Sequence, residues 1–298
     1  MTDERGAALR TAVSAMGVVV GIEVTGARAA EVLARVPELW AHCRADDEAE
    51  PETVVPVHFD GRDDAPGGKA DDDAVGNPDN TEGEDADARG PVRHRTEPVT
   101  APDLEDLLQL LTQRITVAAI DALEGRHLML HAACLADPTT GRAAVFVAPG
   151  GTGKTTLVRT LGPGRWYVTD ETAVIRSDGS IEPYPKPLSV RRKPGSAWKN
   201  ETAPGGAGLV PPAGPVHIVA LSILRRDDAH SGAPAVTTLG TLDAVVELTH
   251  HASHLPSLDR PLQRVAALVE SLGGVHSVTY RESADLAELV DGWLAVPR

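Results

Sequence analysis

Aromatic and sulfur-containing residues are scarce in this chain of 298 residues, which has four Trp, three Tyr, two Phe, three Met and two Cys. Aliphatic side chains must therefore fill most of its core. The two cysteines, Cys43 and Cys134, are far apart in the sequence and lack the short spacing of a metal-binding pair. So low a cysteine content favours a reducing cytoplasm as the location of the protein.

Long apolar runs and an excess of positive charge are also missing. No apolar run reaches the roughly 20 residues that a membrane-spanning helix needs, and the N-terminus lacks a secretion signal. The chain has 28 Lys and Arg against 43 Asp and Glu, a net charge of −15. Because negative charge repels phosphate groups, we expect neither nucleic acid nor an anionic membrane as a nonspecific partner. Length and apolar content are typical of a globular protein of one large or two small domains.

One segment has almost no apolar residues. Residues 60–90 contain eleven acidic and three basic side chains, and Val75 is their only large aliphatic residue. Burial cannot offset the entropy of ordering such a segment, so we predict an acidic disordered linker. A docking tail is the alternative, which the composition favours less. The linker divides the chain into a small N-terminal α/β region (1–59), the linker (60–100) and a larger domain (101–298).

The N-terminal region has alternating strand and helix patterns but no catalytic pattern. Residues 18–24 and 54–59 predict strands, and residues 27–43 predict a helix with one apolar face. Since the region is too small to bury a core of its own comfortably, we expect it to pack on the larger domain.

The larger domain opens with a long helix that Asp103 can cap. Two strands follow, at 128–135 and 143–148, and only the turn 137–141 separates them. Strands joined by so short a turn are antiparallel neighbours, whereas an ordinary doubly wound fold places a helix between successive strands. The sequence therefore predicts an α/β domain with a mixed sheet.

A phosphate-binding loop directly follows the second of these strands. Residues 148–156 read Ala-Pro-Gly-Gly-Thr-Gly-Lys-Thr-Thr, with Ala148 where the usual Walker A pattern has Gly. A glycine-rich turn between strand and helix aims backbone N–H groups and the positive helix end at an anion. We predict that the loop binds a nucleoside triphosphate, with ATP and GTP both open, and places Lys154 on the terminal phosphates and the hydroxyl of Thr155 on Mg²⁺. The predicted nucleotide-binding residues are consecutive: Pro149, Gly150, Gly151, Thr152, Gly153, Lys154, Thr155 and Thr156.

Two adjacent carboxylates, Asp170 and Glu171, interrupt the next apolar strand pattern, at 166–175. They come where that strand should end beside the phosphates. Neighbouring strand residues point to opposite faces, so the two acids differ in role unless the strand ends or bulges there. Phosphoryl transfer needs one carboxylate near the metal and another group that accepts a proton from the attacking hydroxyl.

Together these motifs resemble the C-terminal catalytic domain of HPr kinase/phosphorylase and its HPr-kinase-like relatives, in the fold group of phosphoenolpyruvate carboxykinase. The resemblance covers roughly residues 104–294. Its features are the strand His131, the antiparallel strand pair that enters the loop, the loop itself, the Asp170–Glu171 pair and the following hairpin. By that resemblance Asp170 is the catalytic base, Glu171 is a metal contact, and His131 is a partner that tunes the base.

The resemblance also implies an activity. It predicts an ATP- and Mg²⁺-dependent kinase that transfers the γ-phosphate to a hydroxyl of a peptide or protein, most plausibly a serine. The chain resembles the HPr-kinase-like proteins encoded with ribosomal-peptide biosynthesis enzymes more than it resembles the bifunctional family. The bifunctional family has two aspartates where this chain has Asp-Glu, and its later glycine-rich signature is absent here, which argues against reverse phosphorylase activity. Proteins of this family are often oligomers, so the possibility that this chain forms a homo-oligomer stays open.

Two other functions remain open on sequence grounds. A small-molecule kinase acting on a free amino acid or metabolite would use the same nucleotide site. A non-catalytic ATP-binding switch or scaffold would bind ATP without transfer to any acceptor. In the scaffold hypothesis, ATP would order the Gly/Pro-rich residues 194–215, which we predict to be a mobile loop or a plain spacer.

Two weaker patterns complete the candidates. The basic run 191–193 could hold a substrate phosphate or carboxylate, although solvated surface charge explains it better. His250, His251 and His254 have helical spacing within a predicted helix at 242–255. A metal site would need further ligands aimed at the same point, so we expect a polar helix face.

Overall fold

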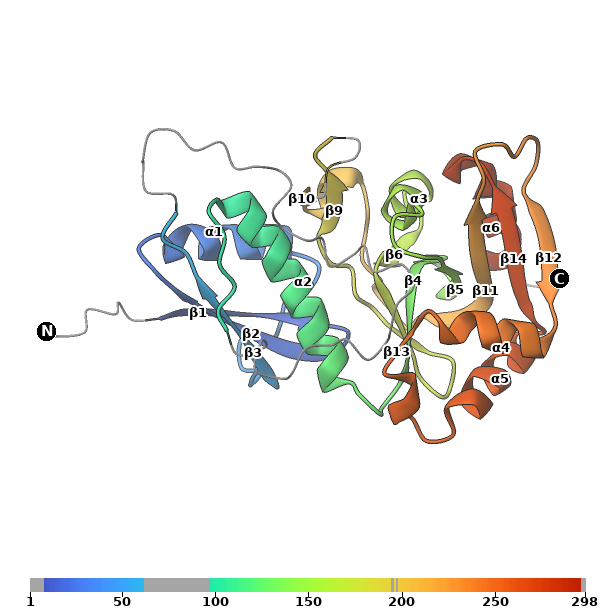
Figure 1. Ribbon diagram of the computed structural model, residues 1–298, viewed down its shortest axis with the longest axis horizontal. Coiled ribbons are helices and arrows are strands. Elements are labelled where there is room, and N and C mark those ends of the chain that lie inside the picture. Colours follow the sequence, from blue (N-terminus) through green and yellow to red (C-terminus); the bar gives the residue numbers. More distant parts are fainter. Residues whose placement is uncertain (1–7, 62–96, 194–195, 197, 296–298) are drawn as a thin grey trace, which may run out of the picture.

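The computed structural model describes residues 8–61, 97–193, 196 and 198–295. The protein is an α/β protein with a three-stranded mixed sheet near its N-terminus and a nine-stranded mixed main sheet (Figure 1). Most of the predicted linker, residues 62–96, lies outside the described residues. Within the described part of the chain, no helix is long and apolar enough to cross a membrane.

The N-terminal sheet has the order β1-β2-β3. Strand β1 (Leu9–Ala15) pairs antiparallel with β2 (Val18–Thr25), and β2 pairs parallel with β3 (Thr53–His58). The sequence patterns predicted β2 and β3 but not β1. Helix α1 (Ala29–Leu39) is shorter than the predicted helix at 27–43. It contains Pro37 in its last turn, and a proline supplies no N–H to continue the helix.

Helix α2 (Leu104–Ala122) joins the N-terminal sheet to the rest of the molecule. Asp103 caps it as predicted, since Asp103 Oδ1 accepts a hydrogen bond of 2.9 Å from the N–H of Asp106. The apolar face of α2 shares one core with the N-terminal sheet, α1 and Tyr184. Val99, inside the range predicted as linker, exchanges backbone hydrogen bonds with residues of β3 and so extends that sheet.

The main sheet has the order β12-β14-β11-β5-β4-β7-β8, and both β6 and β13 also pair with β4. As the short turn predicts, β4 and β5 are antiparallel, while β11 is parallel to both β5 and β14. The sheet is therefore mixed, as expected. Its strands are β4 (Leu128–Ala136), β5 (Arg142–Val147), β6 (Trp166–Thr169), β7 (Thr172–Ile175), β8 (Ile181–Glu182), β11 (His217–Arg226), β12 (Ala235–Leu239), β13 (Ala252–Ser253) and β14 (Val275–Tyr280).

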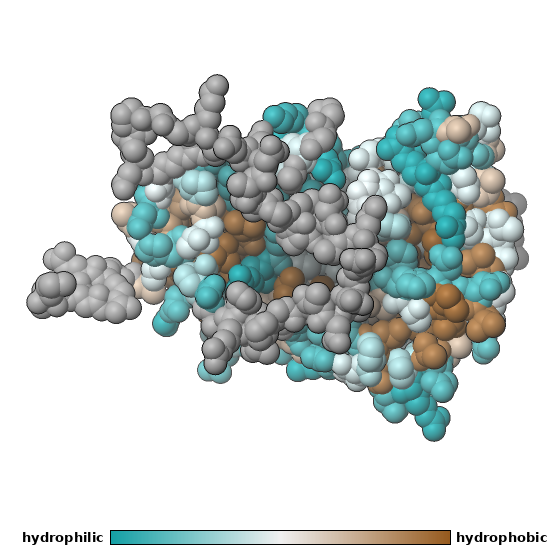
Figure 2. All heavy atoms as spheres, viewed as in Figure 1, coloured by the Kyte–Doolittle hydropathy of each residue, from teal (hydrophilic) through white to brown (hydrophobic). Residues whose placement is uncertain are grey.

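Helices cover both faces of the main sheet. Helices α3 (Lys154–Leu161) and α6 (Ala287–Leu294) pack on one face, with α6 preceded by a 3-10 turn. Helices α4 (Thr241–Thr249) and α5 (Pro261–Ser271) pack on the other (Figure 1). Apolar surface is visible over the α4–α5 side in Figure 2, where Leu242, Val246 and Leu262 are exposed.

Two sequence predictions need correction. The predicted loop at 194–215 contains strand β10 (Lys199–Thr202), which pairs antiparallel with β9 (Leu188–Arg191), and a 3-10 turn at Pro204–Ala207. The side chain of Gln109 holds β10 in place by accepting a hydrogen bond of 2.7 Å from the backbone N–H of Lys199.

The second correction concerns the three histidines. Helix α4 ends at Thr249, and His254 lies in the left-handed region at φ 50°, so His250, His251 and His254 do not share a helix face. His254 instead contacts Asp121 of α2 at 2.9 Å. Among the described residues, no group of three or more His, Cys, Asp or Glu side chains could hold a metal ion.

Candidate functional site

The predicted phosphate loop connects the end of β5 to the start of α3. Gly151 and Gly153 have φ values of 78° and 105°. Only glycine enters this left-handed region without steric cost, so these two positions require the glycines that the motif supplies. Gly153 immediately precedes the first residue of α3. The loop therefore presents the positive end of the helix to the space in front of it.

That space is a cavity of about 300 Å³. We call it the donor cavity, because the loop predicted to hold the phosphate donor lines it. Six of the eight predicted nucleotide-binding residues line it, and Pro149 and Thr152 do not. Among the charged side chains of the lining, cations outnumber the two carboxylates, Asp170 and Glu171. The cations are Lys154, Arg159, Arg191, Lys199 and Arg226. This balance suits a ligand with several negative charges, such as a triphosphate.

Lys154, at the first position of α3, is nearly buried. Its ammonium donates hydrogen bonds of 2.7 Å and 3.0 Å to the backbone carbonyls of Ala148 and Pro149. These contacts fold the lysine side chain back over its own loop. They also explain what Pro149 does in the site, since its carbonyl rather than its side chain takes part.

Asp170 and Glu171 occupy a break between β6 and β7. Both strands pair antiparallel with β4, and a register shift falls within β6, between Tyr167 and Thr169. The buried hydroxyl of Thr169 accepts hydrogen bonds from the backbone N–H groups of Glu171 and Thr172, at 3.1 Å and 3.3 Å. Because the strand ends here, the alternation of side chains is interrupted and both carboxylates line the donor cavity.

Asp170 is completely enclosed, with 1% of its side chain exposed. Its Oδ2 accepts a hydrogen bond of 2.7 Å from the hydroxyl of Thr155, and its Oδ1 accepts one of 2.8 Å from Tyr167. The ammonium of Lys186 lies 3.1 Å from Oδ1. Burial by itself would raise the pKa of Asp170, but the charge of Lys186 and these hydrogen bonds hold it below its ordinary value. Asp170 is thus an ionised acceptor with both oxygens occupied.

Glu171 has a different environment, since 35% of its side chain is exposed. Its Oε1 lies 3.5 Å from Nδ1 of His131. His131 is the one position of β4 that is not buried, and the rest of that strand is apolar. Sequence resemblance implied that His131 would tune Asp170. The geometry puts its imidazole beside Glu171.

His251 lies behind this pair and accepts a backbone hydrogen bond of 2.8 Å from the N–H of His131. Burial, followed by the positive charges of His131 and Lys154, lowers the pKa of His251 to about 4. Its imidazole is therefore neutral at pH 7, and it adds no charge to the site.

Lys186 is the functional-site residue that sequence reasoning missed. Its ammonium contacts Asp170, lies 3.8 Å from Glu171 Oε2 and donates a hydrogen bond of 3.0 Å to the carbonyl of Pro187. Burial would lower the pKa of Lys186, but Asp170, Glu171 and Glu201 together raise it above the ordinary value. A buried ammonium thus bridges the two acids. The available signal was a single lysine between two prolines in an otherwise apolar segment, residues 183–190.

The two arginines of the basic run at 191–193 lie in different surroundings. Arg191 lines the donor cavity. Arg192 points to α2 instead, where it contacts Asp106 at 2.7 Å and lies over the ring of Trp198. Only the first arginine of the run therefore lies where it could meet a phosphate.

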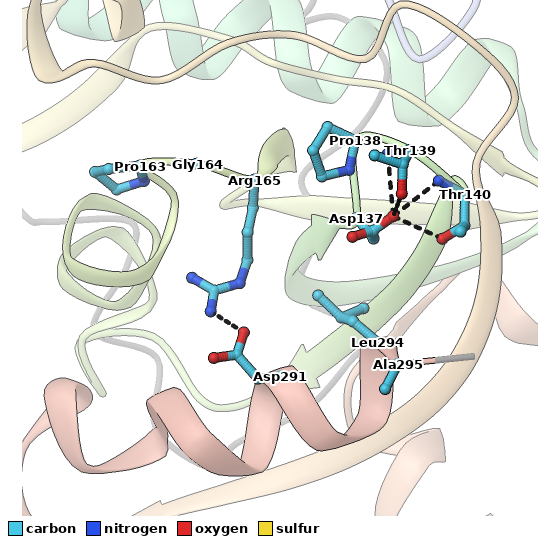
Figure 3. Close-up of a pocket in the computed structure, with 10 residues that line it drawn as sticks. All are labelled: Asp137, Pro138, Thr139, Thr140, Pro163, Gly164, Arg165, Asp291, Leu294 and Ala295. Atoms are coloured by element: carbon cyan, nitrogen blue, oxygen red, sulfur yellow. Dashed lines mark hydrogen bonds and ion pairs between the residues drawn. The ribbon is translucent and has the colours of Figure 1, made fainter. Parts of the chain in front are cut away.

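A separate cavity of about 440 Å³ lies between the turn after β4 and the end of α6 (Figure 3). Its charged groups have partners within the protein. Arg165 forms an ion pair with Asp291, and Asp137 accepts hydrogen bonds from Thr139 and Thr140. Those hydrogen bonds lower the pKa of Asp137 to about 2. Because both carboxylates that line this space, Asp137 and Asp291, are engaged in these contacts, we do not regard it as a reaction site.

The donor cavity, by contrast, combines an anion-binding loop, an enclosed carboxylate that binds the loop hydroxyl, and a more exposed carboxylate beside a histidine. Such an arrangement can bind a phosphorylated donor and deprotonate a second molecule. In comparisons with protein-family models and with curated protein sequences, the chain matches none. The chemistry of the site must therefore be argued from its own residues.

Proposed function

We propose that this protein is an ATP-dependent phosphotransferase that moves the γ-phosphate to a hydroxyl group, with a serine of a peptide or protein as the favoured acceptor. One observation carries the proposal. The hydroxyl of Thr155 in the phosphate loop donates to Asp170, while Glu171 next to it lies beside His131 in the same cavity. Of these two consecutive residues, Asp170 thus faces the phosphate donor and Glu171 is available to the acceptor.

The donor side binds the triphosphate of ATP. Backbone N–H groups of the loop and the N-terminal end of α3 surround the β- and γ-phosphates. Lys154 exchanges its contacts with Ala148 and Pro149 for phosphate oxygens. Arg191, on β9, adds a guanidinium near Gly151 of the loop.

The residues on the donor side also fit Mg²⁺. Thr155 Oγ1 and Asp170 Oδ2 are 2.7 Å apart, and hydroxyl and carboxylate oxygens are the ligands that Mg²⁺ prefers. The lowered pKa of Asp170 keeps that oxygen ionised. When bound, Mg²⁺ neutralises charge that develops on the transferring phosphate.

On the acceptor side, Glu171 is the general base. Its carboxylate takes the proton of the acceptor hydroxyl as the oxygen of that hydroxyl forms a bond to the γ-phosphorus. The bond from the γ-phosphorus to the bridging oxygen breaks, its electron pair stays on the β-phosphate, and ADP leaves. His131, with its Nδ1 3.5 Å from Oε1 of Glu171, orients this carboxylate. This assignment exchanges the roles that sequence resemblance implies for Asp170 and Glu171, because both oxygens of Asp170 already have donors.

Several features support membership of the HPr-kinase-like group with its phosphoenolpyruvate carboxykinase-like fold. They are the antiparallel β4–β5 pair that enters the loop, the mixed sheet, and the acid pair at a strand break. Peptide acceptors in natural-product biosynthesis are then the first substrates to assay. A free amino acid or metabolite is the second class.

The test compares the purified protein with its Glu171→Gln variant, using ATP labelled at the γ-phosphate and acceptors of both classes. We expect the variant to bind ATP and Mg²⁺ as the parent does and to lose transfer by about 10²–10⁴-fold. Asp170→Asn serves as the comparison, since it should weaken binding of Mg²⁺ and ATP as well. ATP binding by the parent without transfer to any acceptor would instead support the switch or scaffold alternative.

A further inference from the structure

A second cavity, of about 320 Å³, adjoins the donor cavity on the side of helix α2. The two cavities have four lining residues in common: His131, Glu171, Ser189 and Lys199. Glu171 and His131, the proposed base and its partner, thus lie at the junction between them. A group in the second cavity would reach Glu171 from the side opposite the phosphate loop.

Some residues line this second cavity but not the donor cavity. The part of the wall that they form is nearly free of charge. Helix α2 provides most of it, and the remaining residues come from β7, the segment before β9, and β13. The residues are Thr112, Gln113, Thr116, Val117, Ile120, Thr172, Lys186 and Ser253. Lys186 is the single charged side chain among them, and Asp170 neutralises it at 3.1 Å. Hydroxyls, one amide and two aliphatic groups therefore line the space.

We propose that this cavity is the acceptor subsite and that it takes an uncharged hydroxylated group, of the size of a serine or threonine side chain within a peptide. The proposal rests on the phosphotransferase function proposed above and adds where the acceptor binds and what chemistry selects it. A free amino acid would bring an ammonium and a carboxylate against the part of the lining that helix α2 provides, which has no charged side chain, and desolvating such charges is costly.

The N-terminal sheet supports the helix that lines this cavity. Helix α2 lies against the N-terminal sheet (Figure 1) and packs its apolar face on it. Its residues Gln113, Thr116 and Val117 line the cavity. Val117 is 42% exposed, so it can be enlarged without disturbing the core. It is therefore the position at which the cavity can be filled selectively.

The experiment measures transfer of labelled γ-phosphate to three acceptors: acetyl-Ala-Ser-Ala-amide, free L-serine and water. The variants are Val117→Trp, which fills the cavity, and Gln113→Glu, which puts a negative charge into it. Val246→Trp is the matched control, because it makes the same substitution at a 51% exposed valine of α4, outside both cavities. Binding of ATP is measured in parallel for all variants.

We expect the parent to prefer the neutral peptide over free serine by about ten-fold or more, which corresponds to roughly 1.4 kcal/mol. Val117→Trp and Gln113→Glu should each lower transfer to the peptide by at least about ten-fold without changing ATP affinity, and Val246→Trp should leave both unchanged. Undiminished transfer by Val117→Trp would overturn the location of the subsite and leave the kinase function intact. A preference for free serine would overturn the acceptor class. A parent that transfers to none of the three, water included, overturns the proposed function and this inference with it.

Discussion

The hydroxyl of Thr155 and the carboxylate of Asp170 are joined by a hydrogen bond of 2.7 Å that ties the start of α3 to the end of β6. Thr155 follows the loop lysine, and Asp170 is held from its other side by Tyr167 and Lys186. The phosphate loop is therefore fixed to the main sheet at the point where a metal-bound phosphate would lie. In the mechanism that we propose, the same contact assigns Asp170 to the donor and leaves Glu171 to the acceptor.

Replacing Thr155 by Val should remove this link. The substitution deletes the hydroxyl but keeps the shape of the side chain, and a hydrogen bond to a charged group contributes about 1.5–3 kcal/mol. We expect ATP affinity in the presence of Mg²⁺ to fall about ten- to hundred-fold, measured by calorimetry. In EDTA, parent and variant should bind ATP with similar affinity. Thr155→Ser, which keeps the hydroxyl, is the control; equal losses in Ser and Val variants would count against the role of the oxygen.

Lys186 should be essential to folding as well as to the site. Its ammonium is buried between Asp170 and Glu171, and removing one partner of a buried ion pair costs about 3–5 kcal/mol. We expect Lys186→Met to lower the free energy of unfolding by that amount and the melting temperature by roughly 10 °C. Lys193→Met, at an exposed position, should change stability by less than about 0.5 kcal/mol.

A second variant separates loss of charge compensation from loss of packing. Because Lys186 mainly neutralises Asp170, adding Asp170→Asn to Lys186→Met should recover part of the lost stability. If the double variant is less stable by the sum of the two single changes, charge compensation is not what Lys186 provides.

The fold of the larger domain was largely predictable because its signals are local. Five turn residues between two apolar strands dictate the β4–β5 hairpin, and a glycine-rich motif between strand and helix dictates the phosphate loop. Strand β1 was missed, since Leu9–Ala15 mixes polar and apolar residues without regular alternation. It pairs with β2 through the two-residue turn Met16–Gly17, with φ values of 56° and 80°, and Met at the first position of such a turn is not a typical hairpin signal.

The division of work between Asp170 and Glu171 was beyond the sequence for a similar reason. Their positions in the chain are adjacent, and the difference between them comes from Thr155, Lys186 and His131, which three other segments supply. Residues 199–202 likewise look like part of a Gly- and Pro-rich loop. They form β10 because the strand Leu188–Arg191 and the side chain of Gln109 offer hydrogen-bond partners.

Glu201, on β10, makes the stability of the protein depend on pH in a specific direction. It is buried, and burial raises its pKa from 4.5 to about 7, in spite of the attraction of Lys186 and a hydrogen bond of 2.8 Å from Ser189. In the unfolded chain the carboxyl returns to its ordinary pKa. Between pH 4.5 and about 7 the folded state therefore holds a proton that the unfolded state has released.

Stability from this group is thus complete below pH 4.5, falls as the pH rises to about 7, and is constant above that value. The loss across the window is on the order of 3 kcal/mol. Glu201→Gln, which cannot ionise, should lack this slope and should gain on the parent from pH 5 to about pH 7 in urea unfolding experiments, with a constant difference at higher pH. Glu270→Gln, at an exposed position, controls for the loss of one carboxylate. Parallel curves for parent and Glu201→Gln would mean that Glu201 is already ionised in the folded protein at acidic pH, held there by Lys186.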